Sequence, residues 1–134
     1  MNVKFAVVSD AVNHTTEGKL NILGIFNAIG ASAFPATHPE MNLVVSFLAS
    51  SVEEGKVKEL EIQLIGSHGK KVLTISGKAV VPKARPGYPV EMNFIQSLRG
   101  IVFEEPGDYA FVILVNGDEK GRASLSVVER GKGG

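Results

Sequence analysis

Side chains that could do chemistry are few and widely separated in this chain. The three histidines, His14, His38 and His68, all lie in segments rich in turn-forming residues, and no two have the short spacing of a helical or hairpin metal motif. The chain has only three aspartates, too few for the loop cluster that a C2-type calcium site needs. The sequence therefore predicts no metal site and no cofactor.

Nucleophilic and acid–base motifs are also missing from the sequence. No serine lies in a G-x-S-x-G elbow, and no glycine-rich phosphate loop joins a strand to a helix. The carboxylate pairs Glu53-Glu54 and Glu104-Glu105 are neighbours in expected loops, where adjacent side chains usually face water. We therefore expect no catalytic residue and a protein that is not an enzyme. A hydrolase or isomerase that uses His38 or the glutamate pairs is the remaining enzymatic hypothesis.

The overall composition limits the partners and the compartment. The 134 residues include 14 basic and 14 acidic side chains, so no net charge draws the chain to nucleic acid or to a membrane surface. The absence of cysteine excludes disulfides and is typical of a reducing compartment. The apolar run from Phe5 to Val8 is broken by Asp10 and is too short for a signal peptide. We expect a cytoplasmic protein with no nucleic-acid or membrane partner.

The clearest structural element in the sequence is a β-hairpin near its end. Aromatic and β-branched residues dominate Tyr109 to Val115, and Asn116-Gly117 follows at once. This dipeptide tolerates the positive φ angles of a type I′ turn, so the chain is expected to double back to a strand over Ala123–Val128, with a longer loop or a bulge between them.

The residues just before this hairpin resemble a tyrosine corner. Glu105 lies four residues and Gly107 two residues before Tyr109. In Greek-key sandwiches the tyrosine hydroxyl of such a corner bonds to backbone a few residues upstream. The alternative is that Tyr109 merely begins a strand at the edge of the core. Phe111 takes the position of the antibody cysteine, which excludes a disulfide of that type.

The remaining apolar runs predict more short strands and no convincing helix, apart from one possible helical turn within Ser50–Lys56. The expected strands before the hairpin are Val3–Ser9, Leu20–Ile29, Asn42–Ala49, Val57–Ile65, Lys71–Val81 and one beginning at Val90. We therefore predict an all-β fold, a two-layer antiparallel β-sandwich of about eight strands. An immunoglobulin-like topology is favoured by the tyrosine-corner match, and a jelly roll and a C2-like sandwich are alternatives. The predicted domain spans residues 1–128, and residues 129–134 are expected to form a disordered tail.

Two of the expected strands carry apolar residues on both faces. In a two-layer sandwich one face of each sheet meets water, where an apolar patch commonly marks a protein interface. The candidate interface residues on the water-facing sides are Leu23, Ile25, Ala110, Val112 and Leu114. A loop or the N-terminal strand of the same chain could instead cover these side chains.

Two non-enzymatic hypotheses follow. The first is a structural or protein-interaction module that self-associates as a homo-oligomer, or that binds another protein, through these apolar faces. The alternative is a carbohydrate- or peptide-binding module that uses Asp10–Thr16, Ala31–Pro39 and Pro82–Tyr88 as loops at one end of the sandwich. The absence of tryptophan weakens the carbohydrate version, because sugars usually stack on exposed aromatic side chains.

Four segments of the chain, taken together, resemble a known protein family. They are FAVVSDAV, EGKLNILGIFNAI, PATHPEMNLVVSF and PGDYAFVILVNG. The string is similar to a family of small uncharacterised bacterial proteins known only as a domain of unknown function. The resemblance implies a bacterial, single-domain, all-β protein, and it implies no activity for any residue.

Overall fold

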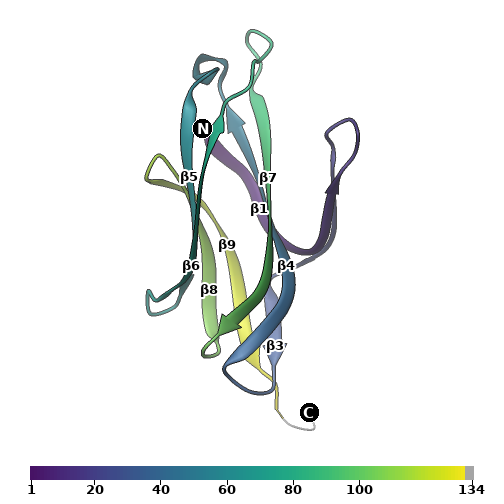
Figure 1. Ribbon diagram of the computed structural model, residues 1–134, viewed down its shortest axis with the longest axis vertical. Helices are drawn as coiled ribbons and strands as arrows, with labels where there is room; N and C mark the ends of the chain where they lie inside the picture. Colours follow the sequence, from purple (N-terminus) through teal and green to yellow (C-terminus); the bar gives the residue numbers. More distant parts are fainter. Residues whose placement is uncertain (132–134) are drawn as a thin grey trace.

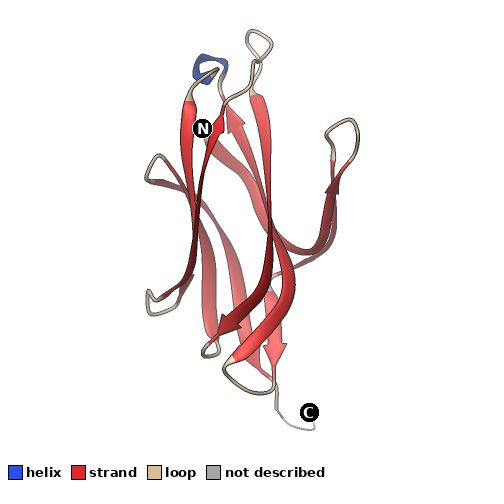
Figure 2. Ribbon diagram, in the orientation of Figure 1, coloured by secondary structure: helices blue, strands red, loops and turns tan. Residues whose placement is uncertain are grey.

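The computed structural model describes residues 1–131, which form two β-sheets and one short 3₁₀ turn (Figures 1 and 2). The elements are β1 (Asn2–His14), β2 (Leu20–Phe26), β3 (Ala28–Ala31), β4 (Ala36–Ala49), η1 (Ser51–Glu53), β5 (Val57–Gly66), β6 (Lys71–Val80), β7 (Val90–Phe103), β8 (Gly107–Val115) and β9 (Asp118–Glu129). The predicted all-β class is confirmed.

The strands form a two-layer sandwich. One sheet has the order β2-β1-β4-β7 and the other the order β3-β9-β8-β5-β6. Neighbouring strands run antiparallel, except that β3 lies parallel to β9, so the expectation of a purely antiparallel sandwich is wrong for this pair. The partial orders β1-β4-β7 and β9-β8-β5-β6 are consistent with the immunoglobulin-like topology that the sequence favoured.

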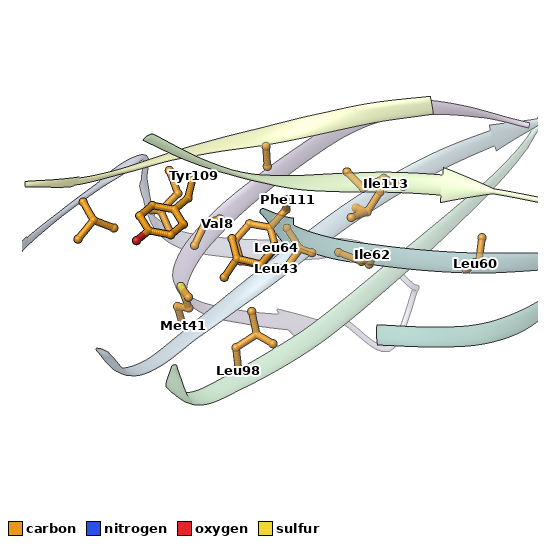
Figure 3. Close-up of a cluster of buried hydrophobic side chains, with 14 of the residues drawn as sticks. Val8, Met41, Leu43, Leu60, Ile62, Leu64, Leu98, Tyr109, Phe111 and Ile113 are labelled. Carbon is orange, nitrogen blue, oxygen red and sulfur yellow. The ribbon is translucent and has the colours of Figure 1, made fainter. Parts of the chain in front are cut away.

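The core lies between the two sheets and is built from alternate residues of the central strands (Figure 3). Leu43 and Phe47 of β4 point into it from one sheet, and Leu64, Phe111 and Ile113 point into it from the other. All five side chains are at most 2% exposed. Because successive side chains of a strand point to opposite faces, this alternation also fixes which residues of each strand face outward.

The β8–β9 hairpin has the turn that the sequence predicted. Asn116 and Gly117 have φ angles of 51° and 83°, as a type I′ turn requires. The register shifts between Ile113 and Leu114, whose partners are Gly121 and Glu119, so Lys120 is an extra residue in a bulge.

Tyr109 joins the start of β8 to the preceding connection. Its hydroxyl donates a hydrogen bond to the backbone carbonyl of Glu105 at 2.6 Å, and its ring meets the Phe103 ring edge-on at 5.0 Å between centroids. Burial raises the pKa of the Tyr109 hydroxyl. Gly107 begins the strand with a φ of 151°, a conformation that favours glycine. This is the contact by which a tyrosine corner ties two strands together.

Several predicted strand boundaries differ from the structure. The expected strand Leu20–Ile29 is two strands, because the chain passes from one sheet to the other at Asn27, whose carbonyl accepts a hydrogen bond from the Ser126 amide. β4 begins at Ala36, within a segment that was expected to be a loop. It passes through Pro39, where β4 pairs only with β7, a setting in which a strand tolerates proline.

The end of the predicted domain also extends further along the chain. β9 runs to Glu129, and the Arg130 amide donates a hydrogen bond to the Ala31 carbonyl at 2.8 Å. The last part of the predicted tail, residues 132–134, lies outside the described residues.

Candidate interaction surface

The β1–β2 hairpin projects from the side of the sandwich (Figure 1). β1 pairs with β4 only as far as Ser9, opposite Asn42, but it pairs with β2 up to His14, opposite Leu20. The sequence predicted that the first strand ends at Ser9. We call residues 10–25 the arm, because over this part of β1 the sheet has only two strands.

A buried polar network fixes the arm where it leaves the sheet. The Asn42 side chain, 7% exposed, donates through Nδ2 to the Asp10 carbonyl at 3.1 Å. Its Oδ1 accepts a hydrogen bond from Ser97 Oγ at 2.8 Å. Because a buried amide left without partners costs roughly 1–3 kcal/mol, these bonds hold the direction of the arm.

The arm is also hydrogen-bonded internally. At its tip the amide of Lys19 donates to Thr15 Oγ1 at 3.0 Å, and Gly18 adopts a φ of 83°. Further down, Asn21 Nδ2 donates to Asn13 Oδ1 at 3.0 Å across the two strands. These contacts define a turn and a register, so the arm presents fixed faces to its surroundings.

Two of the five candidate interface residues lie exposed on this arm. Leu23 is 65% exposed and Ile25 is 61% exposed. Their cross-strand neighbours on that face are Ala11 and Ser9, whose short side chains cannot cover them. The candidate surface of this protein is therefore the outer face of the arm, together with the free edge of β2.

The other three candidate residues lie on β8, in the other sheet, and do not join this surface. Val112 is only 4% exposed, and Ala110 and Leu114 are half-buried. On this outer face the cross-strand neighbours of Val112 are Gln63 and Arg122, two long side chains that flank it. Val112, at the centre of the predicted patch on β8, is therefore covered by the chain itself.

Arg122 is held in place beside Val112 by an ion pair. Its Nε and Nη2 donate to the two carboxylate oxygens of Glu119 at 2.8 and 2.9 Å. The guanidinium beside it lowers the pKa of Glu119. A bidentate pair restricts both side chains to one geometry.

The residues considered for chemistry lie in separate places. His14 ends β1 in the arm, His38 lies in β4 with its ring 6.0 Å from that of Phe26, and His68 lies in the β5–β6 turn. Within residues 1–131, no group of three histidine, aspartate or glutamate side chains is placed to bind a metal ion. The structure brings no two of the histidines together.

A cavity of about 620 Å³ lies between the β5–β6 turn and the β7–β8 connection. Charged residues on its walls include Lys70, Lys71, Glu104 and Glu105. None of the three segments expected to form a ligand site lines it. Those segments also lie apart, because the β6–β7 connection and the β3–β4 connection are at opposite ends of the molecule and the arm projects sideways (Figure 1).

The comparison with protein families decides the relationship of this chain to known proteins. Residues 4–128 match a family of unknown function, DUF6941. The chain belongs to this family. No curated protein matched the chain. The matched residues include strands of both sheets and the whole arm, so the arm lies within the DUF6941 domain. The predicted resemblance to a family of unknown function is confirmed. Residues 1–131 contain no helix that is long and apolar enough to cross a membrane.

Sequence reasoning missed one polar cluster in this DUF6941 domain. Glu53 accepts hydrogen bonds from Lys58 Nζ at 2.9 Å, the Met1 amino group at 2.7 Å and the Ser50 amide at 2.7 Å. The bond from Lys58 and the other two hold the pKa of Glu53 far below its ordinary value of 4.5. The spacing Ser50-x-x-Glu53 is that of a capping box and could have revealed the cluster.

The polar network at Asn42 was also missed. In the predicted strand Asn42–Ala49, Asn42 and Ser46 lie on the face opposite Leu43, Val45 and Phe47. They are buried, at 7% and 0% exposure, because residues from β1 and β7 lie on both sides of β4. The signal in the sequence is that two polar residues, Asn42 and Ser46, share a face of the strand with apolar Val44 and Leu48.

Proposed function

We propose that this DUF6941 chain is a non-enzymatic protein-interaction module that self-associates through the arm. The observation that carries the proposal is the exposure of Leu23 and Ile25 on a strand whose outer edge has no partner. Burial of these side chains against a protein surface removes apolar area from water, which favours association. The absence of cysteine and the family resemblance support a location in the bacterial cytoplasm as part of the same proposal.

The edge of β2 differs from the other long edges of the sandwich. β6 carries Lys71 and Lys78, and β7 carries Glu91 and Arg99, whereas Leu20–Phe26 contains neither a charged residue nor a proline. Charges at an edge oppose unwanted strand pairing. An uncharged apolar edge of seven residues is an aggregation risk for a monomer and is expected where the edge is paired in the working protein.

Sedimentation velocity of two variants tests the proposal. We expect the wild-type chain to sediment as a dimer or a larger assembly, and Ile25→Glu to sediment as a monomer. The matched control is Val80→Glu, because Val80 is 59% exposed on the edge strand of the other sheet and lies far from the arm. This control should keep the wild-type mass. A monomeric wild-type chain at high concentration, or an Ile25→Glu variant with the wild-type mass, would overturn the proposal.

A further inference from the structure

We infer that the partner of β2 is β2 of a second copy, paired antiparallel across a twofold axis. This inference rests on the proposed self-association and adds the mode of contact. The four-stranded sheets of two copies would then form one continuous sheet with their β2 strands at its centre. Such an interface is isologous and closes at two copies.

The first argument is the number of strands in the arm. Over residues 10–14, β1 has lost its partner β4 and pairs with β2 alone. A two-stranded ribbon is at best marginally stable in water. Three or more strands with a shared apolar face can be stable on their own. Pairing two arms through their β2 edges gives a four-stranded sheet and stabilises both hairpins in the same way.

The second argument is the composition of the edge. β2 offers no charge that would select an oppositely charged partner, and an identical strand meets it without repulsion. When the seven residues of β2 pair with themselves about their midpoint, Leu23 lies at the axis and faces its own copy. Asn21 then lies opposite the second copy's Ile25, on the same outer face. The exposed leucines of the two copies therefore cover one another.

The third argument is access to the edge. Figure 1 shows that the arm stands away from the two packed sheets, so two arms can meet side by side while the sandwiches lie on opposite sides of the contact. The alternative within the same sheet is pairing of β2 with β7 of the next copy. That contact is heterologous and would continue into a filament rather than close.

Cysteine cross-linking tests this mode of contact, because the chain has no cysteine of its own. Leu23→Cys should form a covalent dimer on mild oxidation. Asn21→Cys and Ile25→Cys should each remain monomeric on denaturing gels alone but cross-link when mixed. Val80→Cys is the control, because Val80 is 59% exposed, close to the 61% of Ile25 and the 65% of Leu23. We expect the Leu23→Cys dimer to form at least about tenfold faster than the control dimer, because pairing raises the local thiol concentration.

The outcomes separate the inference from the proposed function. Cross-linking of Asn21→Cys with itself and of Ile25→Cys with itself would indicate parallel pairing and overturn the inference. An assembly that keeps the wild-type mass in all three variants but shows no cross-link above the control would also overturn it, while self-association itself would stand. A wild-type chain that stays monomeric would overturn both. Circular dichroism of each variant checks that these exposed substitutions preserve the fold.

Discussion

β2 and β8 share a sequence pattern but differ in exposure. Both strands carry apolar residues on their outer face, yet Ile25 is 61% exposed and Val112 is 4% exposed. β8 lies between β5 and β9, which place Gln63 and Arg122 beside Val112. β2 has a single neighbour, which places only the short side chains of Ala11 and Ser9 opposite Leu23 and Ile25. The position of a strand in its sheet thus decides whether the apolar side chains on its outer face are exposed to water.

The largest expected difference between the two strands is in stability. Val112→Glu places a carboxylate among buried groups in the centre of a sheet and should lower the free energy of unfolding by about 3 kcal/mol. Ile25→Glu places the same group in water and should change the stability of the monomer by less than about 0.5 kcal/mol. Urea unfolding of both variants at low protein concentration measures the difference. Equal losses would show that the arm packs against the sandwich.

Acid should weaken the sandwich without acting on the β2 edge. Because the pKa of Glu53 is lower in the folded chain than its ordinary value of 4.5, its stabilisation is present above that pH and is lost as the pH falls. Glu53→Gln should cost about 2 kcal/mol at pH 7 and show a shallower loss of stability between about pH 5 and pH 3.

β2 contains no ionisable side chain, so assembly through its edge should not depend on charge. The mass of the assembly at pH 7 should change little between low and high salt, since charge screening has nothing to act on at the edge. Unfolding curves of the wild type and Glu53→Gln across the pH range give the first result, and sedimentation in both salts gives the second. If the stability of the wild type and that of Glu53→Gln fell equally as the pH is lowered, the role of Glu53 would be contradicted.

The network at the root of the arm should have a smaller effect on stability. Asn42→Ala removes the bonds to the Asp10 carbonyl and Ser97 Oγ, and should cost about 1–2 kcal/mol. Amide hydrogen exchange should become faster in the arm while the exchange of β8 changes little. Ser97→Ala is the matched control, because it removes one of the two bonds and leaves the arm attached. Faster exchange throughout both sheets would mean that Asn42 supports the whole fold.

The smallest effect is expected from uncovering the face of β8. Gln63→Ser and Arg122→Ser together shorten the two side chains beside Val112 and leave the core unchanged. We expect the fold to persist and the double variant to bind a hydrophobic dye more strongly than the wild type. Dye fluorescence at equal concentrations measures this. An unchanged signal would mean that other groups cover Val112.

The sequence predicted the elements that depend on local residues. The β8–β9 turn follows from Asn116-Gly117, because few other pairs adopt two positive φ angles. The two-layer class follows from the alternation of apolar and polar residues in several strands. Both predictions rest on neighbours in the chain, and the structure confirms both.

The sequence did not predict features that depend on distant residues. The break at Asn27 was missed, since apolar residues continue on both sides of it although the chain changes sheets. The cover of Val112 comes from Gln63 and Arg122, which lie on different strands far along the chain. The arm was missed because Asp10 and His14 suggested a turn, whereas polar residues are accommodated in a strand that lies in water.

Static light scattering of the wild-type chain on a size-exclusion column, over a wide range of loading concentrations, tests the central claim most directly. The account predicts a mass of twice 14.2 kDa that falls toward 14.2 kDa on dilution. A mass of 14.2 kDa at every concentration would show that the exposed face of the arm does not bind a second copy, and would contradict the account.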